Sequence, residues 1–392
     1  DSVRIFDRIF VSSTVSSPRE NRREMGARAS KPQESSPATM RRIVCTMPAP
    51  KVEDAQLAIE EVPLPVPRTG EVLIKVAAAP VNPSDYGKWK KVLGPGEQWT
   101  PLPMGNEGSG VVVASGGGVL ADRLVGKSVG FVNLVKQGSW SEFVTASALK
   151  AVFQLPPTLP AEDGASFYVN PYTAYAIVDT ARRRGGKGFV HTGAASQLGQ
   201  MLVKYCATEA TDITLLNVVR REEQARILRS LGAKYVLVSA GDEWKLNLKQ
   251  TVKELGLEVA FDCVAGEMTE ILVDALPKGG TCYVYGRLSG EAARIAPIDL
   301  IYFSKTVEGF LVAGTGSQAW INLSKPVTAL WRLNAAGKAV NAGLAGGGWA
   351  STKFDDCELD TMHARFLEMW GTSGFTDRKL RIRMPATVEP EL

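Results

Sequence analysis

The chain has 392 residues, of which 45% are hydrophobic, which is enough to build two domains with buried cores. Its formal net charge is +4, and acidic and basic residues are mixed along the whole chain, so charge gives no sign of a nucleic-acid-binding surface. No stretch approaches the ~18 consecutive apolar residues of a membrane span, so we expect neither nucleic acid nor membrane as a partner.

The cysteines and histidines argue against a disulfide framework and against a zinc site. The five cysteines lie far apart without a C-x-x-C pair, and only two histidines, His191 and His363, are present. A reducing compartment fits this pattern better than an oxidising one. A catalytic zinc needs three converging ligands of these types, and the sequence offers no such cluster, so we expect no metal.

Residues 1–39 form an N-terminal extension that is rich in Ser, Arg and Pro and has no sustained apolar period. One interpretation is a disordered tail, or an arm that lies on the domain. The other is the remainder of a targeting segment, because organelle transit peptides are rich in Arg and Ser. The second interpretation predicts a mitochondrial location, although five acidic residues weigh against it, and the first is compatible with the cytoplasm.

From residue 40 to about residue 150, short runs typical of β-strands are separated by Gly and Pro. These runs are "MRRIVCTM", "EVLIKVAAAPV", "GSGVVVAS", "KSVGFV" and "WSEFVTA". Their spacing favours a compact, partly closed β domain. The pattern then changes, and "PYTAYAIVDTARRRGG" predicts a helix that ends at Gly185 and Gly186.

The next part of the chain alternates strand and helix patterns. Strands are predicted at 188–192, 213–219, 235–239, 258–264, 281–286 and 306–314, with helices at 197–207, 222–232, 243–256 and 267–276. Such alternation predicts an α/β fold with a doubly wound parallel sheet of the Rossmann type. A helix at 325–337 and a flexible loop at 342–351 follow, and the chain end predicts a helix and a strand that return to the first domain.

The turn after the first of these strands has the composition of a phosphate-binding turn. Its residues are Gly193, Ala194, Ala195, Ser196, Gln197, Leu198 and Gly199. Small residues leave the backbone open, the hydroxyl of Ser196 can bind a phosphate oxygen, and Gly199 allows the helix to pack closely on the sheet. Because G-x-G-x-x-G is absent, the turn alone is equally compatible with a simple bend.

The second strand ends in Arg220 and Arg221, with no acidic residue before Glu222. In a dinucleotide-binding fold, an acid at this place binds the ribose 2′-hydroxyl, whereas an arginine binds a 2′-phosphate. Arginines at a helix N-terminus oppose the helix dipole, which argues against a purely solvated role. We therefore predict NADPH rather than NADH as the cofactor. His191, inside the first strand, is interpreted as a packed or capping residue rather than as a general base.

Several segments together resemble the medium-chain dehydrogenase/reductase superfamily. They are "VNPSDYG", "PLPMGNEGSGVVV", "YVNPYTAY", "VHTGAASQLGQ", "NVVRREEQARILRSLGA" and "FDCVAGEMT". Within the superfamily they are most similar to the zinc-free quinone oxidoreductases and mitochondrial 2-enoyl thioester reductases. The resemblance implies a GroES-like catalytic domain from residues 40–165 and 345–392 around a Rossmann domain at 166–344. It also implies a homodimer built by the edge strand near "TVEGFLVAG".

The same resemblance implies further site residues. It implies that Asn170 contacts the nicotinamide side, that Ala195 to Leu198 form the pyrophosphate turn, and that Arg220 and Arg221 clamp the 2′-phosphate. Segments around Tyr285 and Gly286, and around Phe310, match those that flank the nicotinamide, and Lys379 matches a lysine that reaches the cofactor. Zinc members carry Gly-His-Glu where this chain has Gly105, Asn106 and Glu107, which agrees with the absence of a zinc ligand set.

One position departs from the family pattern. The enoyl thioester reductases carry a proton-donating tyrosine eight positions after the Asn-Pro-Ser-Asp motif, and this chain has Leu93 there. Tyr86 would serve if the loop differs, although a packing role suits it better. Asn82, backbone N–H groups or a cofactor hydroxyl are further candidates to stabilise negative charge on the acceptor.

These predictions lead to two functional hypotheses. The first is an NADPH-dependent oxidoreductase that transfers hydride to a quinone, an enone or a 2-enoyl thioester. The second, motivated by Leu93 and by residues 1–39, is an NADPH-binding accessory subunit of a larger assembly with little or no catalysis. The identity of the acceptor is not encoded in any motif that we can identify.

Overall fold

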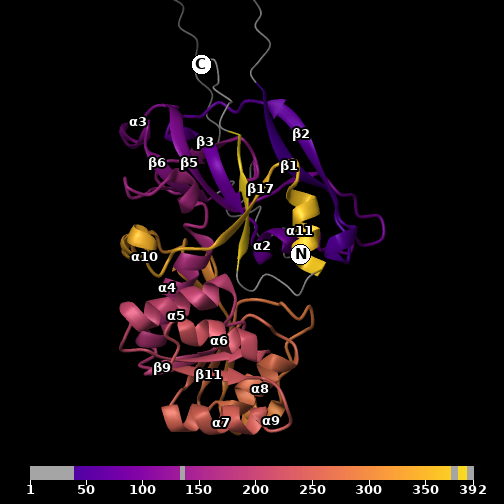
Figure 1. Ribbon diagram of the computed structural model, residues 1–392, viewed down its shortest axis with the longest axis vertical. Helices are drawn as coiled ribbons and strands as arrows, with labels where there is room; N and C mark the ends of the chain where they lie inside the picture. Colours follow the sequence, from indigo (N-terminus) through magenta and orange to yellow (C-terminus); the bar gives the residue numbers. More distant parts are fainter. Residues whose placement is uncertain (1–38, 133–136, 372–377, 386–392) are drawn as a thin grey trace, which may run out of the picture.

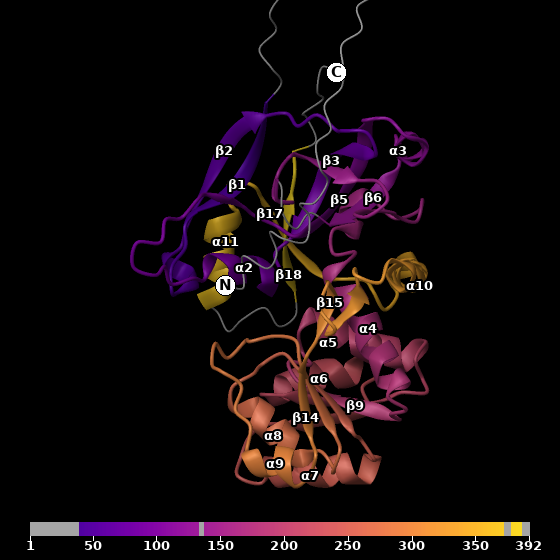
Figure 2. The same ribbon diagram turned by 180° about the vertical axis from the view of Figure 1, so that it is seen from behind.

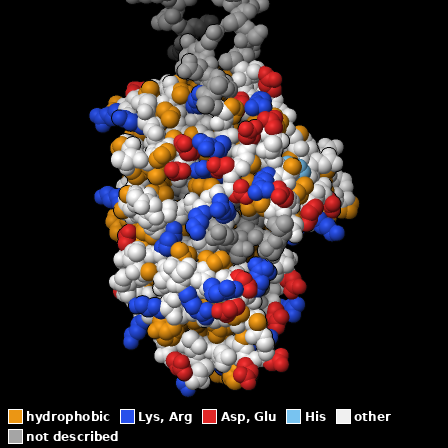
Figure 3. Space-filling model, in the orientation of Figure 1, with side chains coloured by type: hydrophobic (Ala, Val, Ile, Leu, Met, Phe, Trp, Pro, Cys, Tyr) orange, Lys and Arg blue, Asp and Glu red, His pale blue; other side chains and the backbone are white. Residues whose placement is uncertain are grey.

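The computed structural model describes residues 39–132, 137–371 and 378–385, arranged as two parts along the long axis of the molecule (Figure 1). Except for Thr39, the predicted extension at 1–39 lies outside the described residues. Among the helices that the structure describes, none combines the length and the apolar character needed to cross a membrane. Basic and acidic side chains are interspersed over the face drawn in Figure 3.

The upper part in Figure 1 is built mainly of β-strands. A seven-stranded sheet has the order β17-β18-β3-β5-β6-β8, with β7 paired to β3, and a three-stranded sheet has the order β2-β1-β4. The strands are β1 (Thr39–Met47), β2 (Gln56–Pro63), β3 (Glu71–Pro80), β4 (Leu102–Pro103), β5 (Glu107–Ser115), β6 (Ser128–Val132), β7 (Phe143–Ser147), β8 (Val152–Gln154), β17 (Phe354–Glu358) and β18 (Lys379–Arg383). The short helices α2 (Pro83–Trp89) and α3 (Val119–Leu124) connect them.

The end of the chain returns to the upper part, as the sequence predicts. Strand β18 pairs antiparallel with β3, with Ile382 opposite Ala79, and β17 lies parallel to β18 on its other side. Figure 2 shows both strands in the upper part, with helix α11 (Met362–Gly371) nearby. The sequence predicts the helix and the last strand but not β17, whose composition "FDDCE" is unusual for a strand.

The lower part is a six-stranded parallel sheet with the order β11-β10-β9-β12-β13-β14. This order is the doubly wound arrangement that the strand–helix alternation predicts. The strands are β9 (Gly188–His191), β10 (Thr214–Val219), β11 (Tyr235–Val238), β12 (Val259–Asp262), β13 (Thr281–Val284) and β14 (Thr306–Gly309). The helices are α4 (Val169–Arg183), α5 (Gln197–Thr208), α6 (Glu222–Ser230), α7 (Trp244–Leu255), α8 (Glu267–Ala275) and α9 (Pro297–Ile301).

The segment after β13 differs from the prediction of one strand at 306–314. It forms two short strands, β14 and β15 (Leu311–Gly314), on either side of Phe310. Strand β15 leaves the large sheet and pairs with β16 (Ala319–Asn322). The ring of Phe310 is buried against Phe261 and Tyr283, at centroid distances of 5.4 and 6.0 Å, so the chain changes direction where this side chain enters the core.

Helix α10 (Pro326–Leu344) is longer than the predicted helix at 325–337. Gly337 is not a helix end but a point of close approach, because a Cβ at this position would lie 3.0 Å from the hydroxyl of Tyr172. The prediction of a flexible loop at 342–351 is likewise wrong. Residues 345–347 form a 3₁₀ turn, and Trp349 is buried and stacks on Tyr205 at a centroid distance of 4.2 Å.

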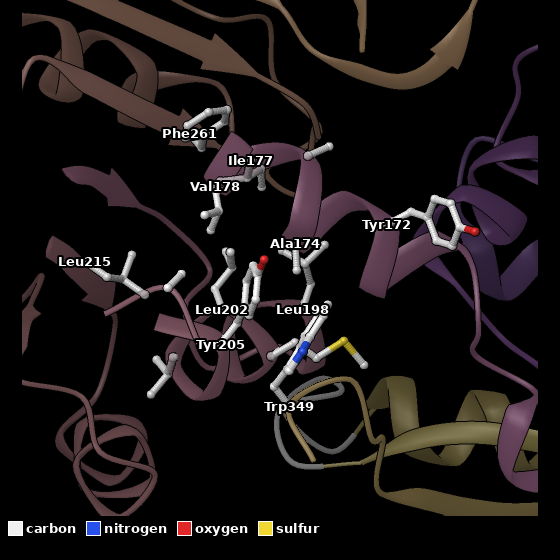
Figure 4. Close-up of a cluster of buried hydrophobic side chains, with 14 of the residues drawn as sticks. Tyr172, Ala174, Ile177, Val178, Leu198, Leu202, Tyr205, Leu215, Phe261 and Trp349 are labelled. Carbon is white, nitrogen blue, oxygen red and sulfur yellow. The ribbon is translucent and has the colours of Figure 1, made fainter. Parts of the chain in front are cut away.

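The largest buried apolar cluster joins α4, α5 and the parallel sheet (Figure 4). Ile177 and Val178 of α4 and Leu198 and Leu202 of α5 face one another in it. Trp349 closes the cluster from the segment that follows α10. A second cluster fills the upper part around Trp89, Trp140 and Phe366. Each part therefore has its own core, as expected for a chain of this length.

Replacement of Trp349 by alanine is expected to lower the free energy of unfolding by about 3–5 kcal/mol, because it empties a fully enclosed aromatic site. Urea denaturation followed by circular dichroism measures the change. Leu246→Ala is the control, since Leu246 is 68% exposed and its loss should alter stability by less than about 0.5 kcal/mol. Equal stabilities of the two variants would contradict a structural role for the 345–350 segment.

Candidate active site

The carboxyl ends of β9 and β12 define the ligand-binding edge of the parallel sheet. These two strands are neighbours, and strand order runs in opposite directions on either side of them. In doubly wound sheets, ligands bind in the crevice outside this switch point. Residues 193–199 follow β9 directly, so the turn with small residues lies where the sequence predicts a phosphate-binding site.

The geometry of this turn depends on its two glycines. Gly193 has φ +58°, and a Cβ there would overlap the thiol of Cys263. A Cβ on Gly199 would overlap the carbonyl oxygen of Ala194, so only glycine lets α5 begin this close to the strand. The hydroxyl of Ser196 caps α5 by accepting the N–H of Gly199 at 3.2 Å.

The free donors of this turn come mainly from its backbone. Leu198 packs into the core, and the side-chain oxygen of Gln197 accepts the N–H of Lys353 at 3.3 Å. Within the described part of the chain, the N–H groups of Ala195 and Leu198 have no acceptor. Unpaired N–H groups at a helix N-terminus bind anions, so the turn has the donors that a pyrophosphate requires.

Arg220 and Arg221 follow β10, next to this turn, and both are exposed. Their backbone N–H groups donate to the side chain of Gln224 at 3.0 and 3.3 Å. The nearby acidic residues are already paired along α6, Glu222 with Arg229 and Glu223 with Arg226. Among the described residues, no carboxylate pairs with Arg220 or Arg221, which leaves two guanidinium groups for an anionic ligand.

Three adjacent strands bring His191, Cys263 and Tyr285 together at the same edge. The Nε2 of His191 lies 2.7 Å from the hydroxyl of Tyr285, and the two rings stack at an interplanar angle of 13°. Burial lowers the pKa of His191 to about 3, so its imidazole is neutral. The interpretation of His191 as a packed residue agrees with this position. Burial also raises the pKa of Cys263 to about 11, so its thiol is protonated.

Asp262 fixes this edge of the sheet. One carboxylate oxygen accepts the hydroxyl of Thr192 and the N–H of Val264, each at 2.8 Å. The other accepts the N–H of Ala265 at 3.2 Å and the hydroxyl of Thr269 at 2.7 Å. A buried carboxylate with four donors is well satisfied, so it holds the ends of β9 and β12 in a fixed relation.

A buried polar network occupies the opposite wall, which belongs to the upper part. The side-chain oxygen of Asn82 accepts the ammonium of Lys379 at 2.7 Å, and its amide nitrogen donates to Glu107 at 2.9 Å. Lys379 also donates to Ser166 at 2.9 Å. Burial lowers the pKa of Lys379 to about 8, and the carboxylates of Glu107 and Asp85 oppose the shift. The structure thus brings together two residues, Asn82 and Lys379, that the sequence analysis names separately.

The second carboxylate oxygen of Glu107 extends this network to the lower part. It accepts the N–H groups of Tyr168 and Val169, both at 2.8 Å, at the first turn of α4. The side chain of Asn170, the next residue, is buried and has no hydrogen-bond partner among the described residues. Its amide is therefore available to a ligand at the junction of the two parts.

Helix α2 carries Ser84 and Lys88, two polar residues bound to Asn106 that the sequence analysis did not name as site residues. The amide of Asn106 donates to the hydroxyl of Ser84 at 2.9 Å and accepts the ammonium of Lys88. Ser84 and Lys88 are four residues apart and so lie on one face of the helix. The available signal was the Asn-Pro-Ser-Asp motif itself, because Asn at the N-cap and an acid three residues later mark a helix start.

Tyr86 lies on the other side of α2, among aromatic rings. Its ring lies 5.2 Å from that of Trp370 and 5.6 Å from that of Phe366. Burial raises the pKa of Tyr86, and Asp85 and Cys263 raise it further, so its phenol stays protonated. This packing agrees with the structural role that the sequence favours. Leu93, in the segment after α2, is half-buried and presents no proton donor.

The remaining predicted residues divide between the crevice and the core. Tyr285 and Gly286 follow β13 at the ligand-binding edge, and a Cβ on Gly286 would lie 2.6 Å from the carbonyl oxygen of Cys263. The side chain of Phe310 points into the core, so only its backbone is near this edge. In the part of the chain that the structure describes, no group of three or more His, Cys, Asp or Glu side chains forms a metal cluster.

Comparison with known proteins identifies both halves of the chain. Residues 68–157 match the model of the alcohol dehydrogenase GroES-like domain, and residues 198–328 match that of the zinc-binding dehydrogenase family. A mitochondrial enoyl-[acyl-carrier-protein] reductase of Xenopus tropicalis is 31% identical over 268 residues, which are 65% of this chain and 73% of that protein. Prostaglandin reductase-3 of Mus musculus is 27% identical over 290 residues, 70% of this chain and 73% of that protein.

A solved structure from Mesorhizobium loti, of a protein assigned as an NADPH:quinone reductase, is similar along nearly its whole length. It is 30% identical, covers 89% of this chain and 99% of its own, and superposes with a TM-score of 0.75. These matches confirm the predicted fold class, a mostly-β GroES-like domain joined to a Rossmann domain.

Proposed function

Because the chain belongs to the medium-chain dehydrogenase/reductase superfamily, we propose that it is an NADPH-dependent reductase of a quinone, an enone or a 2-enoyl thioester. The observation that carries the choice of cofactor is the pair Arg220 and Arg221, exposed at the end of β10 without a carboxylate partner among the described residues. Two guanidinium groups at this place suit a 2′-phosphate.

The donors of the turn suit the remainder of the cofactor. The N–H groups of Ala195 and Leu198, with the hydroxyl of Ser196, would hold the pyrophosphate at the N-terminus of α5. The free amide of Asn170 and the backbone around Gly286 would orient the nicotinamide end. When bound, the reduced nicotinamide supplies the hydride, and the residues of this chain bind it, orient it and exclude water.

The names of the relatives support the acceptor classes but do not distinguish them. They include an enoyl-[acyl-carrier-protein] reductase, a prostaglandin reductase and a protein assigned as a quinone reductase. All three names are compatible with an acceptor that has an alkene or a ring conjugated to a carbonyl. Asn82 is fully buried and is bonded on both sides, so its proposed contact with the acceptor would be indirect.

Turnover with a panel of acceptors tests the proposal. Oxidation of NADPH, followed at 340 nm, is expected with at least one of crotonyl-CoA, a simple enone and a 1,4-benzoquinone. Binding of NADPH, measured by its fluorescence, should be retained whether or not an acceptor turns over. Tight binding with no oxidation by any acceptor would favour the accessory-subunit hypothesis, and absence of binding would contradict both.

Arg220→Ala should weaken NADPH binding by about 10- to 100-fold, the effect of losing one charge-assisted hydrogen bond worth about 1.5–3 kcal/mol. Binding of NADH, which lacks the 2′-phosphate, should change little, so the preference for NADPH shrinks. Arg226→Ala is the matched control, because Arg226 is an exposed arginine of the adjacent helix and pairs with Glu223. A similar loss of NADH and NADPH affinity in Arg220→Ala would count against the phosphate clamp.

The second candidate, an accessory subunit that binds NADPH, is favoured by one observation. Leu93 replaces the tyrosine expected of an enoyl thioester reductase, and Tyr86 packs among Trp89, Phe366 and Trp370 instead of substituting for it. The relatives whose names include "mitochondrial" support a mitochondrial location for either candidate, which subcellular fractionation would test.

We also propose that the chain forms a homodimer through the face that includes β15 and the start of α10. Large apolar side chains are exposed there, among them Leu311 (40%), Val327 (84%) and Trp331 (66%). Exposed apolar side chains that gather on one face are typical of protein interfaces. Light scattering should give twice the chain mass for the wild type, and Trp331→Glu should shift it toward the single-chain mass. A wild-type monomer at micromolar concentration would contradict the proposal.

A further inference from the structure

The proposed reaction leaves a negative charge on the acceptor that a proton must neutralise. After the acceptor gains a hydride, the charge resides on its carbonyl oxygen or on the carbon next to it. Leu93 has no acidic proton. Burial raises the pKa of Tyr86, whose ring packs on Phe366 and Trp370, so its phenol is a weaker acid than usual. A more acidic group at the junction of the two parts would serve better.

Helix α2 lies along the junction of the two parts. At its beginning, Asn82 bonds Lys379, which in turn bonds Ser166 just before α4. At its end, the ammonium of Lys90 lies 3.5 Å from the position that a Cβ of Gly290 would occupy, in the loop after β13. The helix thus extends from the segment before α4 to the loop that follows the carboxyl end of β13, at the junction of the two parts.

On this helix, Lys88 is held in one position and keeps donors free. Its ammonium donates to the side-chain oxygen of Asn106, whose amide nitrogen bonds Ser84. Asn106 therefore fixes an ammonium and a hydroxyl one helical turn apart. An ammonium has three N–H donors, and only one of them is used by a partner within the described residues. Lys88 itself is half-buried, whereas Asn106, to which its ammonium is bound, is 3% exposed.

We propose that Lys88 is the proton donor of the reaction, in place of the tyrosine that the family carries at the position of Leu93. The inference rests on the proposed function. In the step, an N–H bond of the Lys88 ammonium breaks and its electron pair stays on Nζ. The proton forms an O–H or C–H bond with the acceptor anion produced by hydride addition. The neutral amine then recovers a proton from water.

The charged groups around Lys88 suit this role. Burial lowers the pKa of Lys88, and the carboxylate of Asp85, on the same helix, opposes the shift. Burial raises the pKa of Asp85 itself to about 7, with Glu107 of β5 and Lys379 of β18 acting on it as well. A lysine whose pKa is lowered by burial gives up a proton more readily than an exposed one.

The test compares Lys88→Met, Lys88→Arg and Lys127→Met with the wild type. For crotonyl-CoA, Lys88→Met is expected to lower kcat by about 10²–10⁴-fold, the usual effect of losing a general acid. Reduction of a benzoquinone should fall far less, because a hydroquinone anion is stable and water can protonate it. Lys127→Met removes the same charge from an exposed site before β6, away from the loop after β13, and should leave kcat unchanged. The Kd for NADPH should be the same in all four proteins.

A pH profile separates an acid from a structural residue. In the wild type, kcat should fall as pH rises through the pKa of Lys88, because the neutral amine has no proton to donate. Burial lowers the pKa of Lys379 to about 8, so it titrates at alkaline pH as well, and the part of the alkaline fall due to Lys88 is the part that Lys88→Met loses and Lys127→Met keeps. Lys88→Arg keeps the positive charge beside Asp85, but a guanidinium does not release its proton in this pH range. We therefore expect this variant to fold normally and to lack the part of the alkaline fall in kcat that depends on Lys88.

Distinct results identify which proposal fails. If the wild type oxidises NADPH with none of the acceptors, the proposed function fails, and the inference about Lys88 fails with it. If the wild type is active and Lys88→Met has a normal kcat with crotonyl-CoA, only the inference is overturned. Equal losses in Lys88→Met and Lys127→Met, or a loss that is matched by a weaker Kd for NADPH, would overturn it too.

Discussion

The carboxylate of Glu107 is the interaction on which the relation between the two parts depends. One oxygen binds Asn82 in the upper part, and the other accepts two backbone N–H groups at the first turn of α4 in the lower part. Glu107 is fully buried, so neither set of bonds competes with water. A helix N-terminus stabilises a negative charge. Helix α4 is therefore anchored to the first residue of β5, next to Asn170.

The residues around Glu107 form a charge-balanced group rather than a single ion pair. Asp85 and Glu107 contribute two carboxyl groups, and Lys88 and Lys379 contribute two ammonium groups. Buried charges are costly unless they are paired, and an apolar core would generally be as stable. One carboxylate oxygen of Asp85 has no partner among the described residues, so stability alone does not account for this group of charges at the junction of the two parts.

Local patterns in the sequence predict most of the lower part, because alternating strands and helices of regular length specify a parallel sheet almost without reference to distant residues. The turn at 193–199 and the position of Arg220 follow from the same logic.

The polar network of the upper part is different, because Asn82 and Lys379 are 297 residues apart and no periodicity connects them. Short elements such as α2, which contains both Pro83 and Gly87, also escape prediction, since propensity alone disfavours them. Trp349 shows the same limit, because a glycine-rich segment becomes ordered only through the core that receives its one large side chain.

The position of β18 has a consequence for how the protein is made. This strand pairs with residues 78–80 of β3, yet it is translated only after the whole parallel sheet. Until then, the end of β3 presents unsatisfied backbone groups that could pair with another chain. The nascent upper part thus remains incomplete on the ribosome while the lower part, whose contacts are mostly between neighbouring segments, can already fold. The strand that completes the upper sheet also carries Lys379, so the polar network at the junction forms last. A chain interrupted before β18 lacks both this strand and one of the two ammonium groups of the network.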